Sequence, residues 1–243
     1  MKDMSTVGRM WHLYKKGGIT PAVASMFDPQ NAQHMAFIRS FMKEQRKNSL
    51  YEVRLENMEA VVFDLETTGF SPYNGDEIIS IGAISISGGF IKQEETFYSL
   101  TQPKGKIPEQ VERLTGITTE EAAKAPELIT VLREFLEFVQ HRVLIVHGSG
   151  HDKHFLNSAL WKTSKVNLSH RLLDCLILAK RMHPKLGNYS LDALLDMYEI
   201  ESDSRHHALY DSVMTARLWG KLLHEVMERE VLTLGDLYEY LSH

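Results

Sequence analysis

The stretch Ala60-Val61-Val62-Phe63-Asp64-Leu65-Glu66-Thr67 decides the fold, because an apolar run ends there in two carboxylates. A segment rich in Val and Phe is typical of a buried β-strand. Side chains two positions apart on a strand point to the same face, so Asp64 and Glu66 are expected to lie side by side. Two buried like charges are costly unless a cation lies between them, and oxygen ligands favour Mg²⁺ or Mn²⁺. The alternative is a strand whose end simply reaches solvent.

The composition is that of an ordinary globular protein, with 43% hydrophobic and 24% charged residues in a chain of 243. Its one cysteine, Cys175, excludes an internal disulfide and is typical of a reducing compartment. No stretch approaches the roughly 18 apolar residues that a membrane span needs. No apolar signal core follows Met1. We therefore expect a cytoplasmic protein without a membrane partner.

The charge is uneven along the chain. Residues 1–57 hold nine Lys/Arg and five Asp/Glu, a net charge of +4, which leaves −9 for residues 58–243 out of the total of −5. A net acidic chain weakens the prediction of a nucleic-acid partner, although metal ligands would account for part of the acidity. We interpret residues 1–57 as a basic N-terminal extension, with a helix from Pro29 to about Lys47. Its basic face is either solvated or contacts phosphate.

The rest of the chain, 58–243, is predicted to form an α/β domain. Apolar runs and the turn signal Gly88-Gly89 predict a hairpin followed by alternating helices and strands, which favours a mixed sheet flanked by helices. The expected strands are 60–66, 77–86, 90–100, 142–146 and about 171–174. The expected helices are 108–114, 119–123, 127–140, 152–163, 175–182, 190–198, 208–229 and a C-terminal helix at 234–241.

Two further segments carry acidic residues next to histidines, 147–156 and 206–212. Asp152 is expected at the end of a glycine-rich loop, near the start of a helix, where it either caps the helix or holds a metal. His206 and Asp211 are five residues apart, which is about 500° on a helix, so their side chains would diverge. Both reach one site only if His206 lies at or before the start of the helix.

The histidines leave a second type of metal site open. Five of them fall in the same two segments: His147, His151, His154, His206 and His207. A zinc site would use such ligands, and the adjacent His151 and Asp152 are also found in metal phosphohydrolases of the His-Asp type. Cysteine support is absent and carboxylates dominate, which favours Mg²⁺ or Mn²⁺.

Taken in order, these segments resemble the DEDDh (DnaQ-like) family of 3′–5′ exonucleases, which includes the proofreading epsilon subunit of bacterial DNA polymerase III. The resemblance covers about residues 58–225. It rests on Phe63-Asp64-Leu65-Glu66-Thr67-Thr68-Gly69, on Val146 to Leu156, on His206-His207-Ala208-Leu209-Tyr210-Asp211, and on two supporting segments, Pro108 to Thr118 and Leu173 to Leu176. It implies the ribonuclease H-like fold. Two positions depart from the family pattern: Gly148 replaces an Asn, which predicts a more mobile loop, and His151 replaces a Phe.

The resemblance also implies a two-metal hydrolysis of phosphodiesters and a role for each matching residue. Asp64, Glu66, Asp152 and Asp211 would hold two divalent ions, Mg²⁺ or Mn²⁺, and His206 would take the proton of the attacking water. Leu65, Thr67 and Thr68 would meet the terminal nucleotide. Leu114 would either wedge against a base or lie in the core, and Asp174 is expected to cap a helix.

The predicted activity is therefore a 3′–5′ exonuclease that releases nucleoside monophosphates, with DNA favoured over RNA as its partner. Two alternatives stay open. One is an exoribonuclease similar to RNase T or oligoribonuclease. The other is a module that docks on a polymerase or helicase, with nuclease activity secondary.

Overall fold

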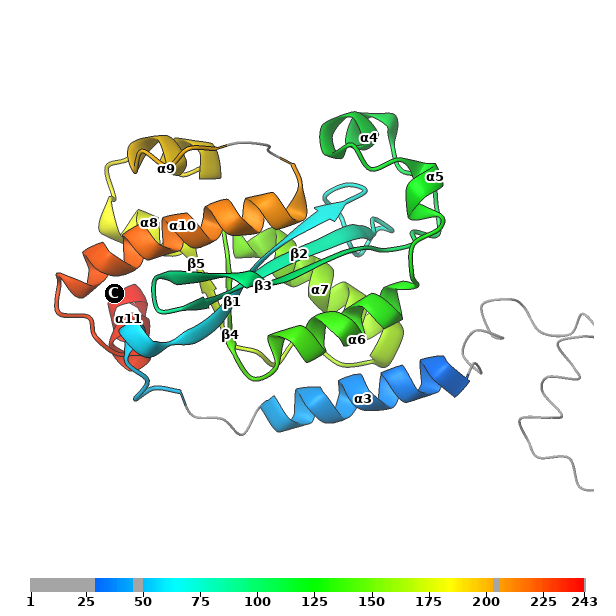
Figure 1. Cartoon of the computed structure of the whole chain (residues 1–243), viewed down its shortest axis with the longest axis horizontal. Coiled ribbons are helices and arrows are strands. Elements are labelled where there is room, and N and C mark those ends of the chain that lie inside the picture. Colours follow the sequence, from blue (N-terminus) through cyan, green and yellow to red (C-terminus); the bar gives the residue numbers. More distant parts are fainter. Residues whose placement is uncertain (1–28, 46–49, 203–205, 243) are drawn as a thin grey trace, which may run out of the picture.

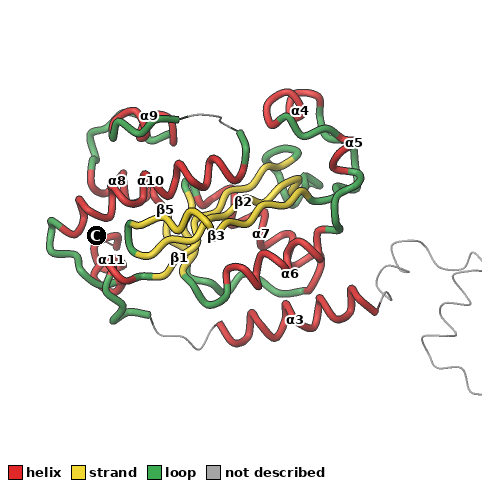
Figure 2. The backbone as a smooth tube through the Cα atoms, viewed as in Figure 1, coloured by secondary structure: helices red, strands yellow, loops and turns green. Residues whose placement is uncertain are grey.

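The computed structural model describes residues 29–45, 50–202 and 206–242, which fold around a five-stranded sheet of order β3-β2-β1-β4-β5 (Figures 1 and 2). The strands are β1 (Glu59–Thr67), β2 (Ile78–Ser87), β3 (Phe90–Leu100), β4 (Val143–Val146) and β5 (Leu172–Asp174). Strands β1, β2 and β3 pair antiparallel, whereas β4 pairs parallel with both β1 and β5. The predicted mixed sheet is confirmed.

Strand β1 is central and both of its faces are covered, which explains why its sequence is almost continuously apolar. Ala60 and Val62 belong to one core cluster and Val61 and Phe63 to the other, so successive side chains alternate between the faces. By the same alternation Asp64 and Glu66 continue the face of Ala60 and Val62. The strand thus delivers its two carboxylates to one side of the sheet.

Helices cover both faces, as predicted (Figure 1). The face that carries Asp64 packs against α8 (Cys175–Met182), α9 (Leu191–Met197), α10 (Ala208–Met227) and α11 (Leu234–Ser242). The opposite face packs against α3 (Pro29–Gln45), α6 (Leu128–Val139) and α7 (Ser149–Ser164). A short turn, η2 (Leu55–Asn57), precedes β1, and α4 (Glu109–Thr115) and α5 (Thr119–Ala122) connect β3 to α6. Among the described helices, none is long and apolar enough to cross a membrane.

The start of α10 lies unusually close to the sheet, at Gly82 of β2. A side chain on Gly82 would overlap with the backbone of Ala208 and Leu209, so only glycine fits here. The hydroxyl of Ser212 lies 2.9 Å from the carbonyl oxygen of Gly82 and secures the same contact. Gly82 pairs with Asp64 in the neighbouring strand, so the first turn of α10 is held directly beside the carboxylates of β1.

Helix α3 is integrated into the core of the domain, which its amphipathic pattern did not reveal. Ile38 and Met42 are 0% and 2% exposed within the cluster that also contains residues of α6 and α7. Arg39, on the predicted basic face, donates from Nε to the carbonyl oxygen of Ser164 at 2.8 Å. The helix thus lies on the face of the sheet opposite α10. Of the predicted basic segment 1–57, residues 1–28 and 46–49, which include Arg46 and Lys47, lie outside the described residues.

Candidate active site

Three of the four predicted metal ligands come together at the end of β1. Carboxylate oxygens of Asp64, Glu66 and Asp211 all lie within 4.8 Å of one another. Glu66 and Asp211 are only 9% and 5% exposed, so their charges are largely removed from water. Three clustered carboxylates offer oxygen donors only, and a hard divalent cation both fits that donor set and relieves the repulsion between them. The residues present therefore fit Mg²⁺ or Mn²⁺. We call Asp64, Glu66 and Asp211 the acidic cluster.

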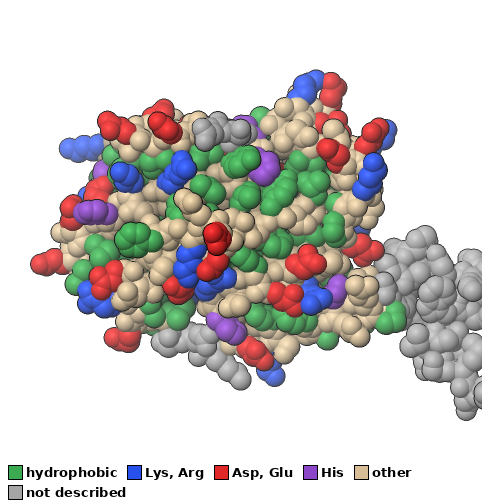
Figure 3. Space-filling view, in the orientation of Figure 1, with side chains coloured by type: hydrophobic (Ala, Val, Ile, Leu, Met, Phe, Trp, Pro, Cys, Tyr) green, Lys and Arg blue, Asp and Glu red, His purple; other side chains and the backbone are tan. Residues whose placement is uncertain are grey.

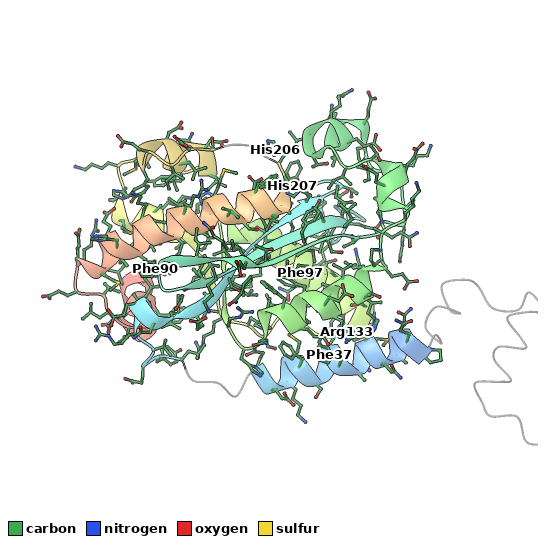
Figure 4. The ribbon with its side chains drawn as sticks, in the orientation of Figure 1. Phe37, Phe90, Phe97, Arg133, His206 and His207 are labelled. Atoms are coloured by element: carbon green, nitrogen blue, oxygen red, sulfur yellow. The ribbon has the colours of Figure 1, made fainter. Side chains whose placement is uncertain are left out.

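His206 lies just before α10, as the five-residue spacing required. The helix begins at Ala208 with His207 as its N-cap residue, and His206 adopts a positive φ of 65°. This conformation costs a non-glycine residue about 1–2 kcal/mol, and such strain is often found at functional sites. The backbone N–H of His206 donates to Oδ2 of Asp211 at 3.0 Å. The backbone of the predicted proton acceptor thus binds a predicted metal ligand, and Figure 4 shows His206 at the start of α10.

Asp152 lies beside the acidic cluster but is not one of its three members. Asp152 lies near the start of a helix, as predicted, but α7 begins three residues earlier than expected, at Ser149, so that Asp152 belongs to its first turn. Its side chain is 4% exposed. Burial, together with the charges of Asp174 and Glu66, raises the pKa of Asp152 to about 8, although hydrogen bonds from the backbone N–H groups of Asp152 and Leu65 act in the opposite direction. Without a cation, this carboxyl therefore holds a proton at neutral pH.

Asp174 fixes the segment that carries Asp152. As predicted, it caps a helix, accepting the N–H of Leu176 at 2.8 Å at the start of α8. It also accepts the N–H groups of Gly148 at 3.0 Å and of Ser149 at 2.7 Å. One buried carboxylate thus holds the beginnings of α7 and α8 together. The prediction of a mobile loop at Gly148 did not take this contact into account. Its only signal in the sequence is an acidic residue at the end of a strand.

His151 replaces an apolar anchor without giving up its packing. Its ring lies 4.6 Å from that of Phe155 and 5.9 Å from that of Phe70, measured between centroids. Its Nε2 is 3.3 Å from Oγ1 of Thr67, whose hydroxyl donates to the carbonyl oxygen of Gly69 at 2.7 Å. Because the Thr67 hydroxyl proton is already used, His151 is the donor. Burial, and then the neighbouring His154, lower the pKa of His151. The histidine thus links α7 to the end of β1.

The predicted nucleotide contacts differ in accessibility. Leu65 is 5% exposed and lies in the core, so only its backbone can meet a substrate. The hydroxyl of Thr68 accepts the N–H of Glu77 at 2.9 Å and shapes the loop between β1 and β2. Leu114 on α4 is 54% exposed, which excludes the alternative of a core leucine. Contact of these residues and of Thr67 with a nucleotide stays a prediction.

Nothing in the geometry of the histidines supports a zinc site. Within the described ranges, the group with metal-binding geometry consists of carboxylates alone. Nε2 of His147 lies 3.0 Å from the carbonyl oxygen of Tyr189, and the ring of His154 packs 6.2 Å from that of Tyr73. These histidines therefore serve packing and loop contacts.

Comparison with known proteins identifies the family of the chain. A family model described as exonuclease, of the RNase T type, matches residues 61–219, a range that contains Asp64, Glu66, Asp152, His206 and Asp211. The chain belongs to this exonuclease family. It is 34% identical to the DNA polymerase III subunit epsilon of Aquifex aeolicus over 73% of this chain and 86% of that protein. It is 35% identical to a DNA polymerase III of PolC type from Caldanaerobacter subterraneus over 78% of this chain. It spans only 13% of the length of that PolC-type polymerase.

Solved structures show the same fold at low sequence identity. The nuclease domain of 3′hExo, a DEDDh family member bound to rAMP, superposes with a TM-score of 0.62 and 20% identity over 73% of this exonuclease and 94% of that chain. Exonuclease X in complex with 5′ overhanging duplex DNA superposes with a TM-score of 0.55 and 21% identity over 68% and 92% of the two chains. The predicted ribonuclease H-like fold and DEDDh family membership are confirmed.

Proposed function

We propose that this exonuclease is metal-dependent and removes nucleoside monophosphates from single-stranded or frayed 3′ ends of DNA. The observation that carries the proposal is the convergence of Asp64 and Glu66 from β1 with Asp211 from α10, directly after His206. DNA is favoured because the relatives at 34–35% identity are named as DNA polymerase III components. RNA is the second candidate, since 3′hExo, a fold neighbour, is described bound to rAMP.

Each predicted site residue has a separate role in the proposed hydrolysis. Asp64, Glu66 and Asp211, together with Asp152, would hold two divalent ions, which in such sites activate a water and stabilise charge on the leaving oxygen. His206 accepts the water proton as the bond from oxygen to phosphorus forms and the bond from phosphorus to the 3′ oxygen breaks. Histidine suits this step because its ring takes up and releases a proton near neutral pH. The backbone of Leu65, with Thr67, Thr68 and Leu114, would position the terminal nucleotide.

The direct test is degradation of matched DNA and RNA oligonucleotides, single- and double-stranded, labelled at the 5′ end and incubated with Mg²⁺ or Mn²⁺. We expect shortening from the 3′ end and release of 5′-monophosphates. Asp64→Ala and Asp211→Ala should abolish cleavage, whereas Asp196→Asn, which changes an exposed carboxyl on α9, should not. Undiminished cleavage by Asp64→Ala would refute the assignment, and products shortened from the 5′ end would refute its polarity.

The role of His206 has its own test. His206→Ala should lower kcat about 10²- to 10⁴-fold, the usual contribution of a general base, and should leave Mn²⁺ affinity intact. Calorimetric titration with Mn²⁺ measures that affinity. If the variant loses the ion, His206 is a ligand and the assigned role is wrong.

We also propose association with a replicative polymerase, because the relatives at 34–35% identity are polymerase III subunits or modules. A truncation that tests this association must leave the core of the domain intact. Deleting residues 1–57 would remove Ile38 and Met42 from the core, whereas deleting residues 1–28 leaves α3 in place. We expect the chain to co-elute with the polymerase catalytic subunit in size-exclusion chromatography and the 1–28 deletion to weaken that complex. Separate elution of the full chain would refute the association.

A further inference from the structure

Three aromatic rings contact one another in a row between β3 and the start of α10. The ring of Tyr98 lies 4.6 Å from that of His207, with an angle of 19° between their planes. The ring of His207 in turn lies 4.5 Å from that of Tyr210, and this second pair is tilted, with an angle of 37° between the planes. We call Tyr98, His207 and Tyr210 the ring ladder. Its outer rings are open to solvent, because Tyr98 is 40% and Tyr210 51% exposed.

The ring ladder borders the acidic cluster. Tyr98 pairs with Gly82, which pairs with Asp64, so Tyr98 and Asp64 stand on the same face of the sheet, two strands or about 10 Å apart. Glycine between them leaves the space that the start of α10 occupies. Figure 4 shows His207 at that start, beside His206 and facing α4, and Figure 3 shows hydrophobic side chains gathered around histidine in the same area.

Packing alone does not explain the exposed ends of the ring ladder. An aromatic residue that only supports the fold usually buries its ring, as Phe63 and Phe135 do in the core. The ring ladder therefore offers partly exposed aromatic ring faces next to the acidic cluster.

We propose that the ring ladder is a base-stacking site for the single-stranded nucleic acid whose 3′ end occupies the acidic cluster. Bases stack on exposed aromatic rings with about 1–3 kcal/mol each and without strong sequence preference. Such contacts hold a strand without added positive charge, which suits a chain with a net charge of −5. The inference rests on the proposed exonuclease function and adds to it a binding site for a base next to the scissile end.

The first experiment measures binding of a short single-stranded oligothymidylate with phosphorothioate linkages, which slow cleavage, by fluorescence anisotropy in Ca²⁺. Tyr210→Leu and Tyr98→Leu should each raise Kd about 5- to 100-fold, and Tyr210→Phe, which keeps the ring, should bind as the wild type does. The control is Phe90→Leu, which removes an 80% exposed ring at the opposite end of β3 and should leave Kd unchanged.

The second experiment locates the stacked base. Each base in turn, counted from the 3′ end, is replaced by an abasic residue, and the effect of Tyr210→Leu and of Tyr98→Leu is measured again. At the stacked position the abasic substitution and one of the Leu variants should no longer have additive effects on Kd. If no position shows this coupling, the base-stacking site is refuted.

Two other results would lead to different conclusions. Leu variants that lower the cleavage rate at unchanged Kd would show that the ring ladder only supports His206, which also overturns the inference. A wild-type chain that neither binds nor cleaves the oligonucleotides would instead overturn the proposed exonuclease function.

Discussion

Asp152 should make the metal-free protein less stable as the pH rises, and Asp152→Asn should remove that dependence. The carboxyl is 4% exposed, and its pKa rises from 3.8 to about 8, first through burial and then through the charges of Asp174 and Glu66. Between these values the folded state holds a proton that the unfolded state releases. The free energy of unfolding therefore falls with rising pH, by at most about 1.4 kcal/mol per unit. From pH 5 to pH 8 this one group contributes a loss of up to about 4 kcal/mol.

Urea denaturation followed by circular dichroism, in EDTA at pH 5, 6, 7 and 8, measures this loss. An asparagine has nearly the same shape and no charge, so Asp152→Asn should show a much smaller decrease and exceed the wild type in stability at pH 8. Asp196→Asn, at an exposed carboxyl on α9, should follow the wild type. Equal pH dependence in the wild type and Asp152→Asn would refute the buried, protonated carboxyl.

The proton on Asp152 should be released to the solvent when a metal ion binds. If Asp152 holds a proton in the metal-free protein and binds a cation as a carboxylate, Mn²⁺ binding near pH 7 must release close to one proton. Calorimetry in buffers of different ionisation enthalpy counts released protons. The release should be smaller in Asp152→Asn, which would also bind Mn²⁺ more weakly.

Three further substitutions test the supports of the site. Gly82→Ala should cost about 1–3 kcal/mol in urea denaturation and reduce cleavage, because the new methyl group overlaps with the start of α10, whereas Gly105→Ala, with open space around it, should behave as the wild type. Ile38→Ala should lower stability by about 2–5 kcal/mol, and a change below 1 kcal/mol would show that α3 is not part of the core. Asp174→Ala should lower both stability and Mn²⁺ affinity, since three backbone N–H groups lose their acceptor. Unchanged Mn²⁺ affinity would show that the hydrogen bonds of Asp174 do not contribute to metal binding.

Much of the fold could be predicted because its local signals agree with one another. The Val-rich run before Asp64 gave the central strand, and Gly88-Gly89 gave the turn between β2 and β3. The spacing of His206 and Asp211 placed the histidine before the helix by geometry alone. Each of these inferences uses residues close together in the sequence, where the period of a strand or helix fixes which side chains share a face.

The rest depended on contacts between distant segments. An amphipathic pattern shows that α3 buries one face, but it does not show that this face covers α6 and α7. Likewise, the role of Gly82 follows from the approach of α10, more than 120 residues later in the chain. The hydrogen bonds from Gly148 and Ser149 to Asp174 join the start of α7 to the start of α8 through a single buried carboxylate, which no periodicity predicts.

The four predicted metal ligands come from the central strand and from helices on both faces of the sheet. This arrangement determines which residues of the site are expected to move when metal or substrate binds. Asp64 and Glu66 belong to the central strand. Asp211 belongs to α10 on one face of the sheet, and Asp152 belongs to α7 on the opposite face. Gly82 holds α10 to the sheet, and Asp174 holds the start of α7, so all four carboxylates are on anchored elements. The loop at Gly148, which was predicted to be more mobile, is held by this contact with Asp174. His206, exposed and with a positive φ, is the residue whose position metal and substrate binding should change.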